Sequence, residues 1–156
     1  MKLAEHFNLS EFTRSETASE RHIDNTPTAS AVTNLKHLCE QVLEPLRCWY
    51  GKPITIGSGY RCPKLNAAVG GVKNSQHMTG EAADLQVVLN VSKSNPEAYN
   101  VELRRLFDFI KSNLPYDQLI LERNKPTSKT YWIHVSCKKD ISRNRNQVIV
   151  GLVKNK

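Results

Sequence analysis

Two residues able to bind a metal ion lie close together in the stretch NSQHMTGEAADL. His77 and Asp84 are seven residues apart, with a glycine and small alanines between them. Gly80 allows backbone conformations that a residue with a side chain adopts only with strain, so the chain can curl until both side chains face one point. An imidazole and a carboxylate held in this frame suit a metal ion better than a packed core.

A period of two in three strand-like stretches separates an apolar face from a face that carries one ionisable side chain. The stretches are AADLQVV, DQLILE and YWIHVSC, and the ionisable residues are Asp84, Glu122 and His134. If the apolar faces pack against helices, these three side chains point into one cleft, provided that the strands pair in the matching register.

His77, His134 and Asp84 form a ligand set suited to zinc. Imidazole nitrogen and carboxylate oxygen both bind zinc at about 2.0–2.2 Å, and three protein ligands leave a fourth position for water. Water in that position can ionise near neutral pH, and Glu122, which is not a ligand, can accept its proton. The residues alone also allow His77 to cap a loop and His134 to be a hydrogen-bonded, half-buried strand histidine.

The remaining elements must position these residues. Over residues 28–51, apolar side chains at intervals of three and four predict an amphipathic helix that is capped near Thr28 or Ser30 and ended by Gly51. Pro45 should bend this helix. Further helices are predicted at NLSEF, SETASERH and, after the polar loop NVSKSNPEA, at NVELRRLFDFIKSNL; PITIGSGY and QVIVGLV are two more strands. This order predicts an α+β fold with helices packed on one face of a mainly antiparallel sheet.

Length and composition indicate one domain, residues 1–156. Hydrophobic residues make up 39% of the chain and charged residues 24%, as is ordinary for a soluble globular protein. No apolar run approaches the roughly 20 residues that span a bilayer, so we expect no stable membrane insertion. The start, MKLAEHFNLSEFTRSE, becomes charged too early for a secretory signal, so we expect synthesis in the cytoplasm.

Neither the net charge nor the cysteines point to a specific function. The net charge is +7, and basic residues gather only in CKKDISRNRNQ, where no aromatic residue interleaves to stack bases. This cluster fits a solvated turn or a polyanionic partner, and we expect no nucleic acid as partner. The cysteines contain no C-x-x-C pair and are predicted to be buried or half-buried free thiols; they are Cys39, Cys48, Cys62 and Cys137.

A longer combination of motifs resembles a known family. SGYRCPKLNAAVGGVKNSQHMTGEAADL, followed by YDQLILE and YWIHVS, is similar to the zinc D-Ala-D-Ala carboxypeptidases, which are peptidases of bacterial peptidoglycan. The likeness runs from LSEFTRSETA to WIHVS and points to the small, phage-associated members. The resemblance implies a Hedgehog/DD-peptidase-like fold, with His77, Asp84 and His134 as ligands of Zn²⁺ and the peptidoglycan stem peptide as substrate.

The resemblance also implies roles for two neighbours of the metal. Arg61 matches an arginine that the family places beside the metal, and its planar fork could hold a substrate carboxylate or the oxyanion of a tetrahedral intermediate. Ser75 matches the serine two residues before the first ligand. It either hydrogen-bonds the substrate or braces the loop.

The catalytic base departs from the family pattern. Many relatives carry an acidic residue or a histidine two or three places before the last ligand, where this chain has Trp132 and Tyr131. Because neither accepts a proton usefully, we assign this role to Glu122. Glu81 is the alternative, and Asp117 is interpreted as a surface residue at the entry of a strand.

These features predict metal-assisted amide hydrolysis by a D,D-carboxypeptidase or an endolysin-type endopeptidase, without indicating which bond is cut. One alternative is a non-catalytic wall-binding or virion structural module of the same fold. A second is a nucleic-acid-binding domain built on the basic cluster. We expect a monomer that acts on the cell wall once host lysis has begun.

Overall fold

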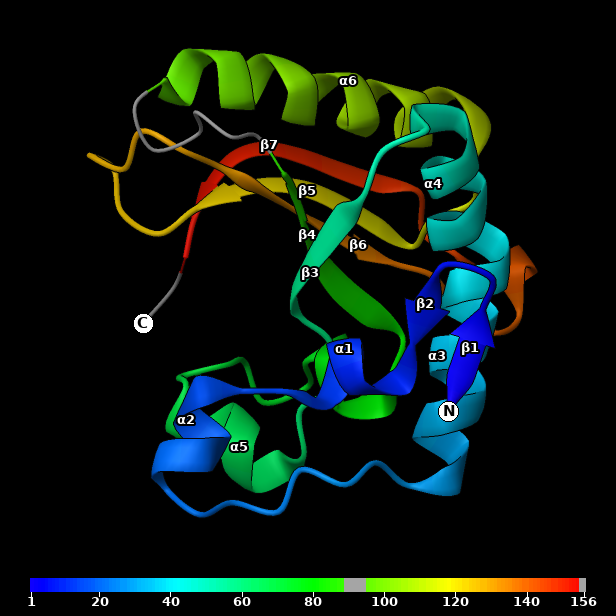
Figure 1. Cartoon of the computed structure of the whole chain (residues 1–156), viewed down its shortest axis with the longest axis vertical. Coiled ribbons are helices and arrows are strands. Elements are labelled where there is room, and N and C mark those ends of the chain that lie inside the picture. The colour runs from blue at the N-terminus through cyan, green and yellow to red at the C-terminus, as the bar shows by residue number, and fades with distance from the viewer. Residues whose placement is uncertain (89–94, 155–156) are drawn as a thin grey trace.

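The computed structural model describes residues 1–88 and 95–154, which fold as an α+β domain (Figure 1). The helices are α1 (Leu9–Thr13), α2 (Glu16–Glu20), α3 (Ala29–Leu38), α4 (Glu44–Tyr50), α5 (Pro63–Ala68) and α6 (Pro96–Asn113). The strands are β1 (Lys2–Ala4), β2 (Phe7–Asn8), β3 (Ile54–Ser58), β4 (Ala82–Val87), β5 (Gln118–Arg123), β6 (Trp132–Ser136) and β7 (Gln147–Val153). Most of the predicted polar loop NVSKSNPEA lies outside the described residues.

Five strands form the main sheet in the order β3-β4-β6-β5-β7. The pairs β3–β4, β4–β6 and β6–β5 are antiparallel, and only β7 runs parallel to its neighbour β5. The predicted α+β fold with a mainly antiparallel sheet is therefore confirmed. β1 and β2 pair with each other in a separate two-stranded hairpin.

One apolar face of this sheet packs with α3, α4 and α6 into a single buried core. Ala83 and Leu85 of β4 are fully buried there, as are Leu103 and Leu106 of α6. Figure 1 shows α6 lying across this face, with α3 and α4 along one end of the sheet. Because these helices cover one face, the ionisable side chains of the central strands lie on the opposite face. The alternation of apolar and polar residues along the strands predicted this arrangement.

The predicted long helix is divided into α3 and α4 by a turn of π-helix at Cys39–Leu43. Thr28 caps α3 by accepting a hydrogen bond from the Ala31 backbone N–H at 3.1 Å, and Gly51 ends α4 with φ 72°. The widened turn ends two positions before Pro45, which lacks an N–H and whose ring would clash with a carbonyl one turn earlier. The structure thus accommodates the proline with a π-turn.

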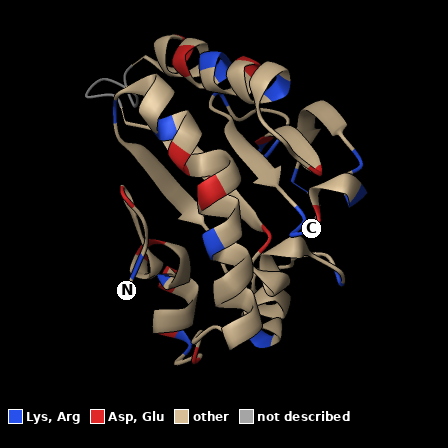
Figure 2. Ribbon diagram, turned by 90° about the vertical axis from the view of Figure 1, so that its right-hand side faces the viewer, with Lys and Arg blue, Asp and Glu red and all other residues tan. Residues whose placement is uncertain are grey.

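The helices carry mixed charge (Figure 2), and the four cysteines are free thiols. No helix within residues 1–88 and 95–154 has the length and apolarity needed to cross a bilayer. Lys and Arg are interspersed with Asp and Glu along the helices (Figure 2). Cys39 and Cys137 are buried and Cys62 is half-buried, but Cys48 is exposed. The prediction for Cys48 was wrong because this residue falls on the solvent side of α4.

Candidate metal centre

His77 is positioned by a tight turn with a specific start and end. The 3₁₀ turn Gln76–Thr79 begins after Ser75, whose Oγ accepts a hydrogen bond from the His77 backbone N–H at 3.2 Å. The turn ends at Gly80 with φ 79°, where an added Cβ would lie 2.4 Å from the carbonyl oxygen of Ala31. Both the backbone angle and the close approach of α3 therefore require glycine here.

The tautomer of His77 follows from its partners. Its Nδ1 lies 2.7 Å from the carbonyl oxygen of Gly59, and because a carbonyl only accepts, Nδ1 carries the proton. In the neutral ring, Nε2 then directs a lone pair at Oδ1 of Asp84, 3.3 Å away. Two acceptors facing each other in a buried site repel, and a cation between them stabilises the arrangement.

Strand pairing places the third residue of this cluster. Asp84 on β4 is the direct partner of His134 on β6, and His134 Nδ1 lies 3.2 Å from the same Asp84 Oδ1. One donor atom from each of His77, Asp84 and His134 lies within 4.8 Å of the other two. Ligands about 2.0–2.2 Å from a tetrahedral ion are roughly 3.3–3.5 Å apart, so both measured separations are close to what zinc requires.

The electrostatics of the cluster favour the metal-binding protonation states. Burial would raise the pKa of Asp84, but the adjacent imidazoles of His77 and His134 hold that pKa well below its usual range. Burial lowers the pKa of His77, although Asp84 opposes this shift. A neutral imidazole and an ionised carboxylate are the forms that coordinate a divalent cation.

The cluster opens into a cavity of about 520 Å³. Its walls come from the α1–α2 connection, the end of β3, the segment between α5 and β4, and the polar face of the sheet as far as β7. All the residues that the sequence and the resemblance assigned to the site line this one cavity: Arg61, Ser75, His77, Asp84, Glu122 and His134.

Arg61 is held beside the cluster by the histidine turn. Its backbone N–H donates to the His77 carbonyl oxygen at 3.0 Å, and its Nη2 donates to Ser75 Oγ at 3.4 Å. Its Nε is buried and has no hydrogen-bond partner within the described part of the chain. Burial lowers the pKa of Arg61, whereas Asp84 and Glu122 raise it. An unpaired buried donor favours an anionic ligand, because such a ligand would satisfy it.

The two candidate bases lie in different places. Glu122 on β5 pairs with Trp132 on β6 and lines the cavity. Burial, and then the negative charge of Asp84, raise the pKa of Glu122, which makes it a better proton acceptor than an exposed carboxylate. Glu81 instead accepts a hydrogen bond from Thr79 Oγ1 at 2.6 Å and lines a separate hollow beside Lys138.

Asp117 is not the surface residue that the sequence suggested, because it is fully buried. Its carboxylate accepts hydrogen bonds from the Arg145 backbone N–H at 2.7 Å, from Arg145 Nη2 at 2.7 Å and from Gln76 Nε2 at 2.9 Å. Gln76 precedes His77, so this network ties the histidine turn to the β6–β7 connection. Its partners are 41 and 28 residues away in the chain, and no local pattern signals such a contact.

The cavity also contains residues that the sequence did not single out. Trp132, rejected as a base, lines it, and its buried indole N–H has no hydrogen-bond partner among residues 1–88 and 95–154. Leu152 and Lys154 reach the cavity because β7 pairs in parallel with β5. The apolar, alternating sequence of β7 predicts a strand but not which neighbour it pairs with.

An α+β domain with a largely buried His-Asp-His cluster lining a cavity is suited to hydrolytic metal chemistry. The sequence profile of Peptidase M15 matches residues 5–126, and the chain belongs to this family of peptidases. The matched region includes His77, Asp84 and Glu122 and ends before His134. A stretch of 34 residues is 56% identical to the zinc D-Ala-D-Ala carboxypeptidase of Streptomyces albus G, covering 22% of this chain and 13% of that protein.

Proposed function

We propose that this chain is a zinc-dependent peptidase that hydrolyses amide bonds in the peptide stem of bacterial peptidoglycan, with His77, Asp84 and His134 as the zinc ligands. The observation that carries the proposal is the shared position of Asp84 Oδ1, 3.3 Å from one imidazole and 3.2 Å from the other. The M15 family and the zinc carboxypeptidase from Streptomyces support the reaction class and the substrate class.

Four cavity residues outside the ligand set have roles in this proposal. A zinc ion, when bound, lowers the pKa of a coordinated water and polarises a carbonyl oxygen. Glu122 accepts the proton of the attacking water and returns it to the leaving amine, because it is an ionisable cavity residue outside the ligand set. Arg61 binds a substrate carboxylate or the developing oxyanion, and Ser75 braces Arg61. Trp132 donates its indole N–H to the substrate.

The decisive experiment is digestion of purified peptidoglycan with and without a chelator, with the products identified by mass spectrometry. We expect hydrolysis that stops on chelation and returns when Zn²⁺ is added. The masses would distinguish loss of a terminal D-Ala from cleavage within the stem or at a cross-bridge. Wall binding without any released product would instead favour the non-catalytic module, and chelator-insensitive hydrolysis would contradict the zinc proposal.

Three variants separate binding from catalysis. His134→Ala should lose both metal and activity, whereas Glu122→Gln should keep the metal and lose turnover by at least about 100-fold. Glu81→Gln is the matched control, because Glu81 lines a separate hollow and not this cavity, and it should retain normal turnover. If Glu122→Gln kept near-normal rates while Glu81→Gln lost them, the base would be reassigned to Glu81.

The timing of action can be tested in cells. We propose that the protein acts on the wall only after the membrane has been opened, as a lysis enzyme of a phage would. Finding it in the periplasm or medium of intact, unlysed cells would contradict this part of the proposal.

A further inference from the structure

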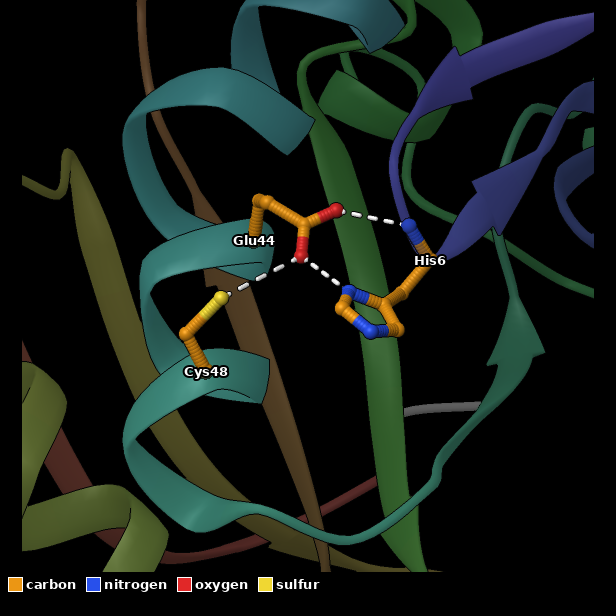
Figure 3. Close-up of side chains that lie close together, drawn as sticks. All are labelled: His6, Glu44 and Cys48. Carbon is orange, nitrogen blue, oxygen red and sulfur yellow. Dashed lines mark hydrogen bonds and ion pairs between the residues drawn. The ribbon is translucent and has the colours of Figure 1, made fainter.

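A second group of potential metal ligands lies on another part of the molecule, between the N-terminal hairpin and α4 (Figure 3). His6 occupies the turn between β1 and β2, Glu44 is the first residue of α4, and Cys48 follows one turn later. His6 Nδ1 lies 2.5 Å from Glu44 Oε2, and Cys48 Sγ lies 3.6 Å from the same oxygen. Figure 3 shows all three side chains pointing toward one another.

The donor atoms form a set that zinc-type cations bind. An imidazole nitrogen, a thiolate sulfur and a carboxylate oxygen all bind zinc, and here one donor from each residue lies within 4.8 Å of the other two. Glu44 and Cys48 are four positions apart and so lie on one face of α4. Residues from two separate elements therefore provide three different ligand types at one point.

The distances require only a small adjustment. Nitrogen, oxygen and sulfur ligands of a tetrahedral zinc lie roughly 3.3–3.7 Å apart. The Sγ–Oε2 separation of 3.6 Å already falls in this range, and His6 would have to withdraw from Oε2 by about 1 Å. The His6 side chain can do so because it is 37% exposed at a hairpin turn. Glu44 is already oriented, since its Oε1 accepts a hydrogen bond from the His6 backbone N–H at 2.8 Å.

Hydrogen bonds already join these side chains, and His6 Nδ1 carries a proton because the carboxylate oxygen that it faces only accepts. The Cys48 thiol donates its proton to the same carboxylate oxygen across 3.6 Å. A thiol–carboxylate hydrogen bond at the surface is weak, because water competes for both groups. A divalent cation would displace the thiol proton and the Nδ1 proton of His6, whose ring would then carry a single proton on Nε2, and it would bind the thiolate together with the imidazole and the carboxylate.

We propose that His6 Nδ1, Glu44 Oε2 and Cys48 Sγ form a surface site for a borderline-soft divalent cation of the zinc type, separate from the cavity cluster, and that the bound cation fastens the β1–β2 hairpin to α4. Three protein ligands leave a fourth position for water. The site shares no residue with the cavity cluster, and its test does not depend on peptidase activity.

Cobalt titration of the purified full chain tests this site directly, because cobalt bound to a thiolate gives a charge-transfer band in the near ultraviolet. The cavity cluster contains no sulfur donor, so this band reports only a site with a cysteine. We expect the chain to bind about two equivalents of Co²⁺, with the band appearing on filling of one of them. Cys48→Ser should lose the band and one equivalent. Cys62→Ser, the control at the other incompletely buried thiol, should keep both.

Two further variants separate this proposal from the peptidase proposal. His134→Ala should lose one equivalent of cobalt but retain the charge-transfer band. His6→Ala should retain peptidase activity while its affinity for the second equivalent falls by about tenfold or more. In the native chain, Zn²⁺ should slow the reaction of Cys48 with a thiol reagent by at least about tenfold.

Three results would contradict the proposal of a second cation site. Binding of a single equivalent without a charge-transfer band would leave the cluster as a hydrogen-bonded contact only. A band that persisted in Cys48→Ser would place the thiolate ligand elsewhere. Modification of Cys48 at the same rate with and without Zn²⁺ would also contradict the proposal.

Discussion

Replacing Asp117 by asparagine tests whether the buried carboxylate network holds the histidine turn in place. The substitution keeps the size of the side chain but removes its charge. Asp117 Oδ1 and Oδ2 accept hydrogen bonds from the backbone N–H, Nε and Nη2 of Arg145 and from Nε2 of Gln76, at 2.7–3.2 Å. In the variant, an amide NH₂ would face the guanidinium group, and at least one of these donors would lose its acceptor.

The size of the effect follows from burial. Removing one partner of a buried ion pair destabilises a protein by about 3–5 kcal/mol, and a hydrogen bond to a charged group contributes about 1.5–3 kcal/mol. Asp117 is fully buried, but the Arg145 side chain is 53% exposed and can regain water when its partner is lost. We therefore expect Asp117→Asn to lower the free energy of unfolding by about 2–4 kcal/mol.

The assay is urea unfolding with a chelator present, so that metal binding does not contribute to stability. Asp108→Asn is the matched control, because Asp108 forms an exposed ion pair with Arg104 at 3.2 Å and its loss should change stability by less than about 1 kcal/mol. Equal effects of the two substitutions would refute the assigned role of Asp117. A separate measurement on the folded variant should show weaker zinc binding where the amide NH₂ takes the position of Oδ2, because Gln76 then loses the acceptor that fixes the start of the histidine turn.

Three further predictions concern pH, a glycine and the arginine of the cavity. Burial would raise the pKa of Asp117, but its hydrogen bonds from Arg145 hold it below the usual range. A carboxyl group whose folded pKa is lowered stabilises the fold above its unfolded pKa of about 3.9 and loses that contribution as the pH falls through the folded value. The difference in unfolding free energy between the native chain and Asp117→Asn should therefore shrink as the pH is lowered from 6 toward 3, and a constant difference would contradict this. Gly80→Ala should destabilise the fold and weaken zinc binding more than Gly70→Ala, because both glycines have positive φ but only a Cβ at Gly80 meets a carbonyl oxygen at 2.4 Å. The strain from φ alone, common to both, is about 1–2 kcal/mol, so equal unfolding free energies would argue against the close contact. Arg61→Lys should lower kcat/KM on wall peptides by about 100-fold without changing zinc affinity, because an ammonium group lacks the planar fork of donors; unaltered kinetics would remove Arg61 from the mechanism.

The sequence alone predicted the features that depend on local geometry. Alternation along AADLQVV and YWIHVSC identified the faces of β4 and β6, because successive side chains of any strand point to opposite sides. The cap at Thr28 and the stop at Gly51 were predictable for the same reason, since each depends on only a few neighbouring residues. The family motifs added an expectation that His77, Asp84 and His134 would meet; strand pairing brings Asp84 and His134 together, and the 3₁₀ turn brings His77 to them.

Tertiary structure decided the contacts between residues that are distant in the chain. Asp117 was interpreted as exposed because a single charged residue carries no information about a partner 28 residues later. Lys154 and Leu152 reach the cavity only through the parallel pairing of β7 with β5, and a strand pattern does not specify its neighbour. The approach of His6 to Glu44 likewise depends on where the N-terminal hairpin packs. Periodicity and capping act within a few residues of the backbone, whereas burial and partner choice arise only when the whole chain closes around its core.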